Sequence, residues 1–142
     1  AGETEAPKYL QRALSEGNTL QDILTANFRV GRTGNDILAR SRAQAIDRGL
    51  TPIIYTHPIG LHGHAAGTTI GMWDKQDGVP GSGDYAMQPN TAYSIELTAE
   101  VSLPEWGDDP LKMKLEQNGF FDGETFRYIQ PRQTQYHLVS SD

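Results

Sequence analysis

Hydrophobic residues in the first third of the chain recur with the period of a helix. Alanine, leucine, isoleucine and phenylalanine at three- and four-residue spacing predict a first helix over residues 6–28, in which Gly17 and Asn18 interrupt the pattern and favour a kink. A second apolar stripe begins after Thr33, a residue type preferred at helix N-caps, and ends before Gly49, the type preferred at C-caps. The pattern therefore predicts two successive helices.

The period then changes to two. Apolar residues alternate with polar ones over residues 93–103 and again over 111–116, which is typical of strands with one buried face. Shorter strands are expected at 52–56, 126–129 and 136–139, while the Gly- and Pro-rich stretch 58–90 reads as a long loop of the kind that often carries function. Two helices followed by a mainly antiparallel sheet predict an α+β fold, with residues 1–142 in one domain.

Composition narrows the possible partners. The 142 residues carry a net charge of −6, which does not favour nucleic acid or an anionic membrane surface as a partner. No run of residues reaches the ~18 apolar positions of a membrane span. The chain has no cysteine, so disulfides, thiolate metal sites and cysteine nucleophiles are excluded.

Residues that could bind a metal or act in catalysis lie in two places. One is the junction of the short strand with the loop, and the other is the polar face of the long strands. His57, His62 and His64 fall within eight residues, and imidazole is a common ligand of catalytic divalent metals. Glu96 and Glu116 occupy polar positions of two predicted strands. Such positions normally face solvent. If this face instead lines a cleft, the two carboxylates and one histidine would suit Mn, Co, Fe or Zn, as one ion or as a pair. Ser82 and Ser94 show no spacing that indicates a catalytic triad.

Three segments, taken in order, resemble a known family. His57-Pro-Ile-Gly with His64 seven residues after His57, then Tyr93-Ser-Ile-Glu96-Leu, then Met113-Lys-Leu-Glu116, are similar to motifs of the pita-bread metallohydrolases, a family that includes creatinase, aminopeptidase P and methionine aminopeptidase. The chain looks nearest the Xaa-Pro peptidase branch. The resemblance covers nearly the whole chain and implies the carboxy-terminal portion of a pita-bread catalytic domain.

The resemblance implies a role for each residue. His57 would be a metal ligand, Glu96 a ligand and the general base for a nucleophilic water, and Glu116 a carboxylate bridging two metals. His64 would contact the peptide substrate and stabilise the tetrahedral intermediate, whereas His62 matches no family position. Two divalent ions would be held in the complete protein.

The chain also departs from the family pattern. Leu97 stands where a proline usually follows the first glutamate, Ile53 stands where a further histidine is common, and the two aspartate ligands that precede the helices in the family have no counterpart here. Asp22, Asp36 and Asp47 lie in predicted helices and are poor substitutes. We therefore expect a portion of a longer metallopeptidase that does not hydrolyse peptides by itself.

The residues alone also allow two alternative functions and lead us to expect self-association. The chain could be a non-catalytic module that binds a peptide or protein in the same cleft, or a small mononuclear zinc protein that uses His57, His62 and His64. A half fold exposes sheet that another half would cover, so a homo-oligomer is also expected.

Overall fold

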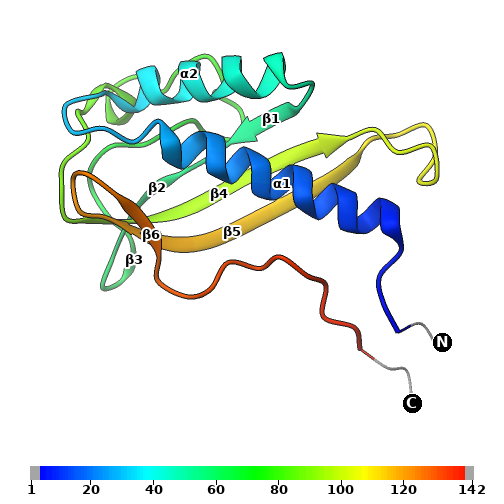
Figure 1. The fold of residues 1–142 in the computed structure, drawn as a ribbon. Helices are drawn as coiled ribbons and strands as arrows, with labels where there is room; N and C mark the ends of the chain where they lie inside the picture. Colours follow the sequence, from blue (N-terminus) through cyan, green and yellow to red (C-terminus); the bar gives the residue numbers. More distant parts are fainter. Residues whose placement is uncertain (1–3, 140–142) are drawn as a thin grey trace.

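The computed structural model describes residues 4–139 and confirms the α+β prediction. Two helices precede a sheet in which every strand pair is antiparallel, and α1 lies across one face of the sheet with α2 beside it (Figure 1). The elements are α1 (Lys8–Ala26), α2 (Gly34–Asp47), β1 (Thr51–Ile54), β2 (His57–Gly60), β3 (Gly63–His64), the 3-10 turn η1 (Ser82–Asp84), β4 (Thr91–Val101), β5 (Leu111–Phe121) and β6 (Phe126–Tyr128). No helix within residues 4–139 is both long enough and apolar enough to cross a bilayer.

Both helices follow their sequence signals. The Thr33 side chain accepts a hydrogen bond from the Asp36 backbone N–H at 3.2 Å, and Gly49 adopts a φ of 79° just after α2, as its predicted capping role requires. The predicted interruption at Gly17 is wrong, because α1 continues through it. A Cβ at Gly17 would lie 2.8 Å from Leu115 Cδ1, so this glycine instead lets the helix approach the sheet closely.

The sheet has the order β3-β2-β4-β5-β6, with β1 also paired to β4. The register is the same for β1 and β2, because Ile54 pairs with Leu97 and His57 pairs with Ser94, so the two segments run along β4 as one strand. The strand in the structure is therefore longer than the one predicted over residues 52–56. It continues through Pro58 to Gly60 and turns back into β3, because pairing with the distant β4 outweighs the local Pro and Gly signals.

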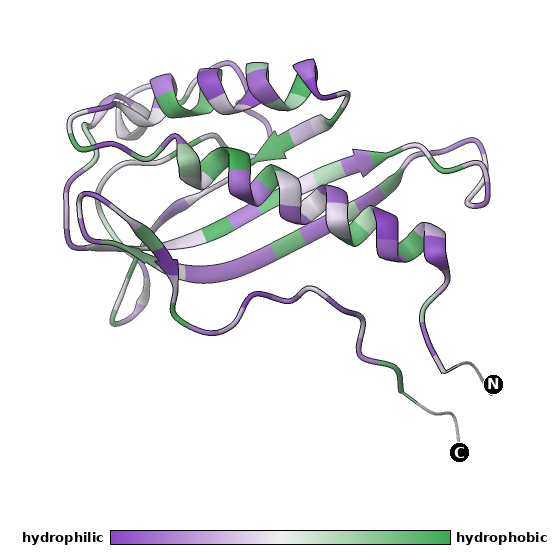
Figure 2. Cartoon of the chain, viewed as in Figure 1, coloured by the Kyte–Doolittle hydropathy of each residue, from purple (hydrophilic) through white to green (hydrophobic). Residues whose placement is uncertain are grey.

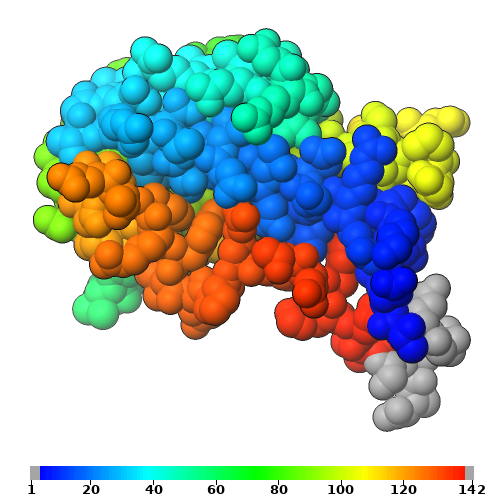
Figure 3. Space-filling model, in the orientation of Figure 1, coloured from blue at the N-terminus to red at the C-terminus, as the bar shows by residue number. Residues whose placement is uncertain are grey.

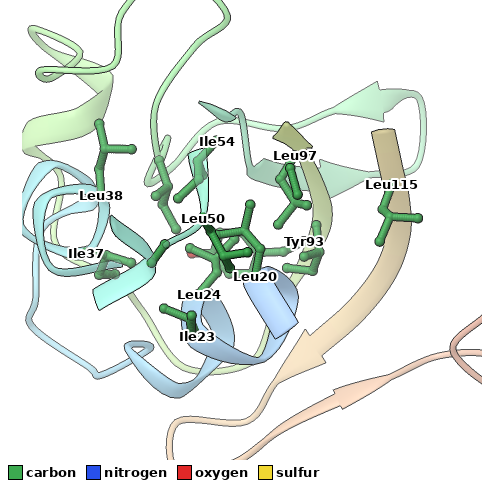
Figure 4. Close-up of a cluster of buried hydrophobic side chains, with 14 of the residues drawn as sticks. Leu20, Ile23, Leu24, Ile37, Leu38, Leu50, Ile54, Tyr93, Leu97 and Leu115 are labelled. Carbon is green, nitrogen blue, oxygen red and sulfur yellow. The ribbon is translucent and has the colours of Figure 1, made fainter. Parts of the chain in front are cut away.

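The core lies between the helices and one face of the sheet. Side chains from both helices and from β1, β4 and β5 converge there (Figure 4), and both helices show alternating hydrophobic and hydrophilic bands (Figure 2). The alternation in β4 predicted this arrangement, since its odd-numbered residues from Tyr93 to Val101 are all buried in the core. The even-numbered residues consequently point to the opposite face of the sheet.

Two predictions near the C-terminus need correction. β5 extends to Phe121 rather than ending at Glu116, and Gly119 permits this because a Cβ there would lie 2.0 Å from the Phe126 ring. Residues 136–139 form no strand. Instead the Tyr136 hydroxyl donates to the Leu10 carbonyl at 3.0 Å, so this segment packs on α1 rather than pairing with a strand.

Candidate functional site

The sheet face opposite the helices brings three of the predicted residues together. Glu96 and Glu116 are register partners on β4 and β5, and His57 pairs with Ser94, two residues from Glu96 on the same face. His57 Nε2 lies 3.5 Å from Glu96 Oε2, with 8% of the histidine side chain and 20% of the glutamate side chain exposed. The alternative prediction, that both glutamates simply face solvent, is therefore wrong for Glu96.

The ring orientation of His57 is determined by its other nitrogen. His57 Nδ1 lies 3.0 Å from the Pro58 carbonyl oxygen, and because a carbonyl only accepts, Nδ1 must carry the donated proton. In the neutral ring Nε2 then holds a lone pair directed at the Glu96 carboxylate. A proton or a cation shared by these two acceptors would make their approach favourable. Metal-bound histidines characteristically donate their second N–H to a carbonyl or carboxylate in this manner.

The two glutamates are close enough to influence each other. Burial raises the pKa of Glu96 above its ordinary value, the nearby Glu116 carboxylate raises it further, and His57 and His64 oppose the shift. Ser94 Oγ donates to Glu116 Oε1 at 3.1 Å and orients that carboxylate. The site therefore holds an excess of negative charge that a cation would relieve.

His64 lies directly beside the site. Its ring stacks on His57 with 3.8 Å between centroids and 15° between planes, and its Nε2 is 3.3 Å from the Tyr55 hydroxyl. The Tyr55 ring lies beside the His57 ring and packs edge-on against Trp73, with 5.7 Å between the Tyr55 and Trp73 centroids. These rings form a row that begins at His57, beside Glu96.

The remaining candidates are separated from this cluster. His62 is exposed between β2 and β3, beside Leu61, which is 94% exposed, and within residues 4–139 it makes no hydrogen bond, ion pair or ring contact. Asp36 pairs with Arg40 at 3.0 Å, and Asp22 is bound by Arg132. Both aspartates lie on the helices, which cover the other face of the sheet.

Two residues of the cluster are not predicted by the motifs. Ser94 shows no spacing of a catalytic triad, yet its position two residues before Glu96 is sufficient to place it on the same face. Tyr55 precedes His57 by two residues and could have been found by the same rule, provided that the strand was known to continue through His57.

The donor types fit a divalent cation, although the side chains do not converge on one point. Over the described range 4–139, no set of three histidine, aspartate or glutamate side chains is positioned to hold a metal ion. One imidazole nitrogen with a free lone pair and two opposed carboxylates nevertheless suit Mn, Fe, Co or Zn. His57, Glu96 and Glu116 are thus the residues on this face that could act as ligands.

Comparisons with known proteins support the fold. The chain is similar to the crystal structure of X-Pro aminopeptidase from Thermotoga maritima MSB8, with a TM-score of 0.61 and 16% sequence identity over 91% of this chain and 34% of that one. The sequence matches no protein-family profile and no curated protein. The chain thus spans about a third of the length of that aminopeptidase. At this level of identity the likeness shows that the fold resembles part of an X-Pro aminopeptidase.

Proposed function

We propose that this chain supplies the His57, Glu96 and Glu116 portion of a divalent-metal site in a peptide hydrolase of the Xaa-Pro aminopeptidase type. The observation that carries the proposal is the 3.5 Å approach of His57 Nε2 to Glu96 Oε2 while His57 Nδ1 is engaged by the Pro58 carbonyl. The similarity in fold to an X-Pro aminopeptidase supports the choice of reaction class.

Each residue has a chemical task in this proposal. A bound divalent cation would polarise a peptide carbonyl and lower the pKa of a bound water. The raised pKa of Glu96 makes its carboxylate a better proton acceptor for a water molecule on this face. Ser94 donates a hydrogen bond to Glu116, and the exposed His64 would donate one to a developing oxyanion.

The chain alone should bind one cation weakly and should not hydrolyse peptides. Two carboxylates and one imidazole leave a second ion short of ligands and of negative charge. Within residues 4–139 the aspartates at 22 and 36 are held in ion pairs on helices and cannot supply them. Hydrolysis would require further carboxylates from outside this chain.

A peptide-binding module without catalysis is the second candidate. Trp73 is 45% exposed and packs against Tyr55, whose ring lies beside His57, so a peptide would find an aromatic surface there. This function needs no metal, so the two candidates differ in whether peptide binding depends on Glu96 and Glu116.

The test is a calorimetric titration of Mn²⁺ and Zn²⁺ into the chain and into a Glu96→Ala/Glu116→Ala double variant. Binding to the unaltered chain that disappears in the double variant is expected, and His62→Ala serves as the matched control that should bind normally. Equal binding by the double variant would rule out this ligand set. Xaa-Pro peptide cleavage by the chain with Mn²⁺, abolished by Glu96→Gln, would overturn the expectation that the chain alone is inactive.

A further inference from the structure

We propose that Gln76 is a positioning residue for the candidate site. Its side chain holds the turn that carries Trp73, and the Trp73 indole supports Tyr55 beside the stacked rings of His57 and His64. The links from Gln76 to the two histidines are hydrogen bonds and ring contacts within this chain. The inference rests on the proposed function only in treating the two histidines as residues of the site.

The turn that carries Trp73 is tight and is fixed to the edge of the sheet. Met72 and Lys75 exchange two backbone hydrogen bonds, at 3.4 and 3.0 Å, which leaves Trp73 at the tip of the turn. The Gln76 side-chain amide donates to the Met72 carbonyl at 2.6 Å. The same amide group bonds the N–H and the carbonyl of Ile54, at 3.0 and 2.8 Å, and therefore joins the base of the turn to β1.

Helix α2 also holds this turn. The Arg42 guanidinium donates to the backbone carbonyl of Gln76, and its Nη1 lies 3.4 Å from a carboxylate oxygen of Asp77. Gln76 is thus fixed through its side chain to β1 and through its main chain to α2. Any displacement of the turn would break hydrogen bonds to both elements.

Trp73 extends across the sheet face that carries the site. Its ring packs edge-on against Tyr55, with 5.7 Å between the centroids, and Lys114 Nζ lies 5.9 Å from the Trp73 ring centroid. The Tyr55 N–H donates to the Glu96 carbonyl of β4, whereas Lys114 belongs to β5 on the other side of β4. A ring that approaches both Tyr55 and Lys114 therefore lies over β4.

The burial of Thr98 agrees with this placement. Thr98 is the register partner of both Ile53 and Lys114 and points to the face without helices, yet only 1% of it is exposed. The helices cannot cover Thr98, because they lie on the other side of the sheet, where the blue and cyan residues of α1 and α2 form much of the near surface (Figure 3). The Trp73 indole, between Tyr55 and Lys114, accounts for this burial.

Tyr55 connects Trp73 to the two histidines. The Tyr55 ring lies beside the His57 ring, with 5.2 Å between the centroids, and its hydroxyl is 3.3 Å from His64 Nε2. Side chains of a site keep their orientation when neighbouring groups lock their rotamers. Loss of the Gln76 amide would release the turn, so Trp73 would no longer be held against Tyr55 and the imidazoles would lose this support.

Trp73 fluorescence in EDTA tests the first link. Trp106, the second tryptophan of the chain, is replaced by Phe throughout, so that Trp73 is the single tryptophan. Gln76→Leu should shift the Trp73 emission to longer wavelength and make the indole more accessible to acrylamide. Arg42→Met should act in the same direction, and it provides the test if circular dichroism shows that Gln76→Leu does not fold. Asp122→Ala is the matched control, because it alters the distant turn between β5 and β6 and should leave the emission unchanged.

NMR of the histidine rings tests the second link in the same metal-free samples. Trp73→Ala should shift the ring-proton signals of His57 and His64, because Tyr55 loses its packing partner and its ring current acts on both imidazoles. Gln76→Leu should shift these signals in the same direction. His62 is exposed at the tip between β2 and β3 and serves as the internal control, since its signals should not move.

Each link can fail separately. Trp73 emission that is unchanged in both Gln76→Leu and Arg42→Met would overturn the role of Gln76. Signals of His57 and His64 that are unchanged in Trp73→Ala would overturn the support of the histidines, whereas movement of both sets of signals would support the proposal. No cation is present in these experiments, so a failed metal titration would count against the proposed function and leave this inference standing.

Discussion

Glu96 and Glu116 face each other across β4 and β5 as direct register partners, on the sheet face that carries no helix. Like charges placed opposite each other in a sheet destabilise it. The pairing is compensated only in part, by His57 beside Glu96 and by the Ser94 hydroxyl on Glu116. The arrangement therefore keeps two carboxylates together at a cost to stability, which is common at functional sites.

Replacing Glu96 by Gln should stabilise the metal-free protein at neutral pH, by about 0.2–1 kcal/mol, the range for cross-strand pairs. The pKa of Glu96 is raised in the folded state, so the folded protein binds this proton more tightly than the unfolded chain, and the ionised group lowers stability above the raised pKa. The difference between variant and unaltered chain should shrink as pH falls below the ordinary carboxyl pKa.

Urea unfolding in EDTA at pH 7 and at pH 4 measures this difference. Ser94→Ala is a useful control, because it frees Glu116 without removing either charge and should not stabilise the protein. A Glu96→Gln variant that is less stable at pH 7 would mean that the contact with His57 outweighs burial and repulsion.

The His62→Ala variant distinguishes the proposed site of His57, Glu96 and Glu116 from a mononuclear zinc site that uses the three histidines. His62 lies exposed at the tip between β2 and β3, away from the stacked His57 and His64 rings, so its removal should leave Zn²⁺ affinity unchanged. His57→Ala should reduce affinity by at least tenfold, since it removes the imidazole ligand. Calorimetry on both variants gives the comparison, and a large loss with His62→Ala would favour the zinc-protein reading.

Asp122 should make the turn between β5 and β6 sensitive to acid. Backbone hydrogen bonds from Thr125 and Glu124, and the Thr125 hydroxyl, lower the pKa of Asp122 to about 2. A lowered carboxyl pKa gives stability that is fully present above the ordinary value of 3.8 and is lost as pH falls towards 2. Asp122→Ala should therefore be destabilising at pH 7, and the difference from the unaltered chain should diminish near pH 2.

Thermal unfolding between pH 7 and pH 2 measures this dependence. Asp122→Asn is the matched control, because its amide oxygen still accepts from the two backbone donors but does not titrate between these values. A difference between Asp122→Ala and the unaltered chain that is the same at every pH would contradict the assigned role of the ionised carboxylate.

Gln76 should be necessary for the closed edge at β1. Its amide group bonds the N–H and the carbonyl of Ile54, which is fully buried, and also donates to the Met72 carbonyl. Gln76→Leu keeps similar volume but leaves these backbone groups unpaired, which should cost about 1–3 kcal/mol. Urea unfolding measures this loss. Gln76→Glu should lose at least as much, because its carboxylate has no hydrogen to donate to the Ile54 and Met72 carbonyl oxygens. A Gln76→Leu variant as stable as the unaltered chain would show that the pairing does not contribute.

The helices and the long strand were predictable because their signals are local. Thr33 and Gly49 mark the ends of α2, and the strict alternation from Tyr93 to Val101 determines which face of β4 is buried and hence that Ser94 and Glu96 share the other. The same rule placed Glu116 on the polar face of β5. Single-residue signals of this kind depend on neighbours in sequence, so they remain valid before any tertiary contact is known.

Tertiary structure alone decided where the strands meet and where they end. The register of β2 on β4 carries the strand through Pro58 and brings His57 to Glu96, and no local pattern encodes a pairing between residues almost forty positions apart. The segment 136–139 has strand-like composition but packs through Tyr136 on α1. A segment can form a strand only where another strand offers unpaired backbone groups beside it. The same residues therefore form a strand or an irregular segment according to what they pack against.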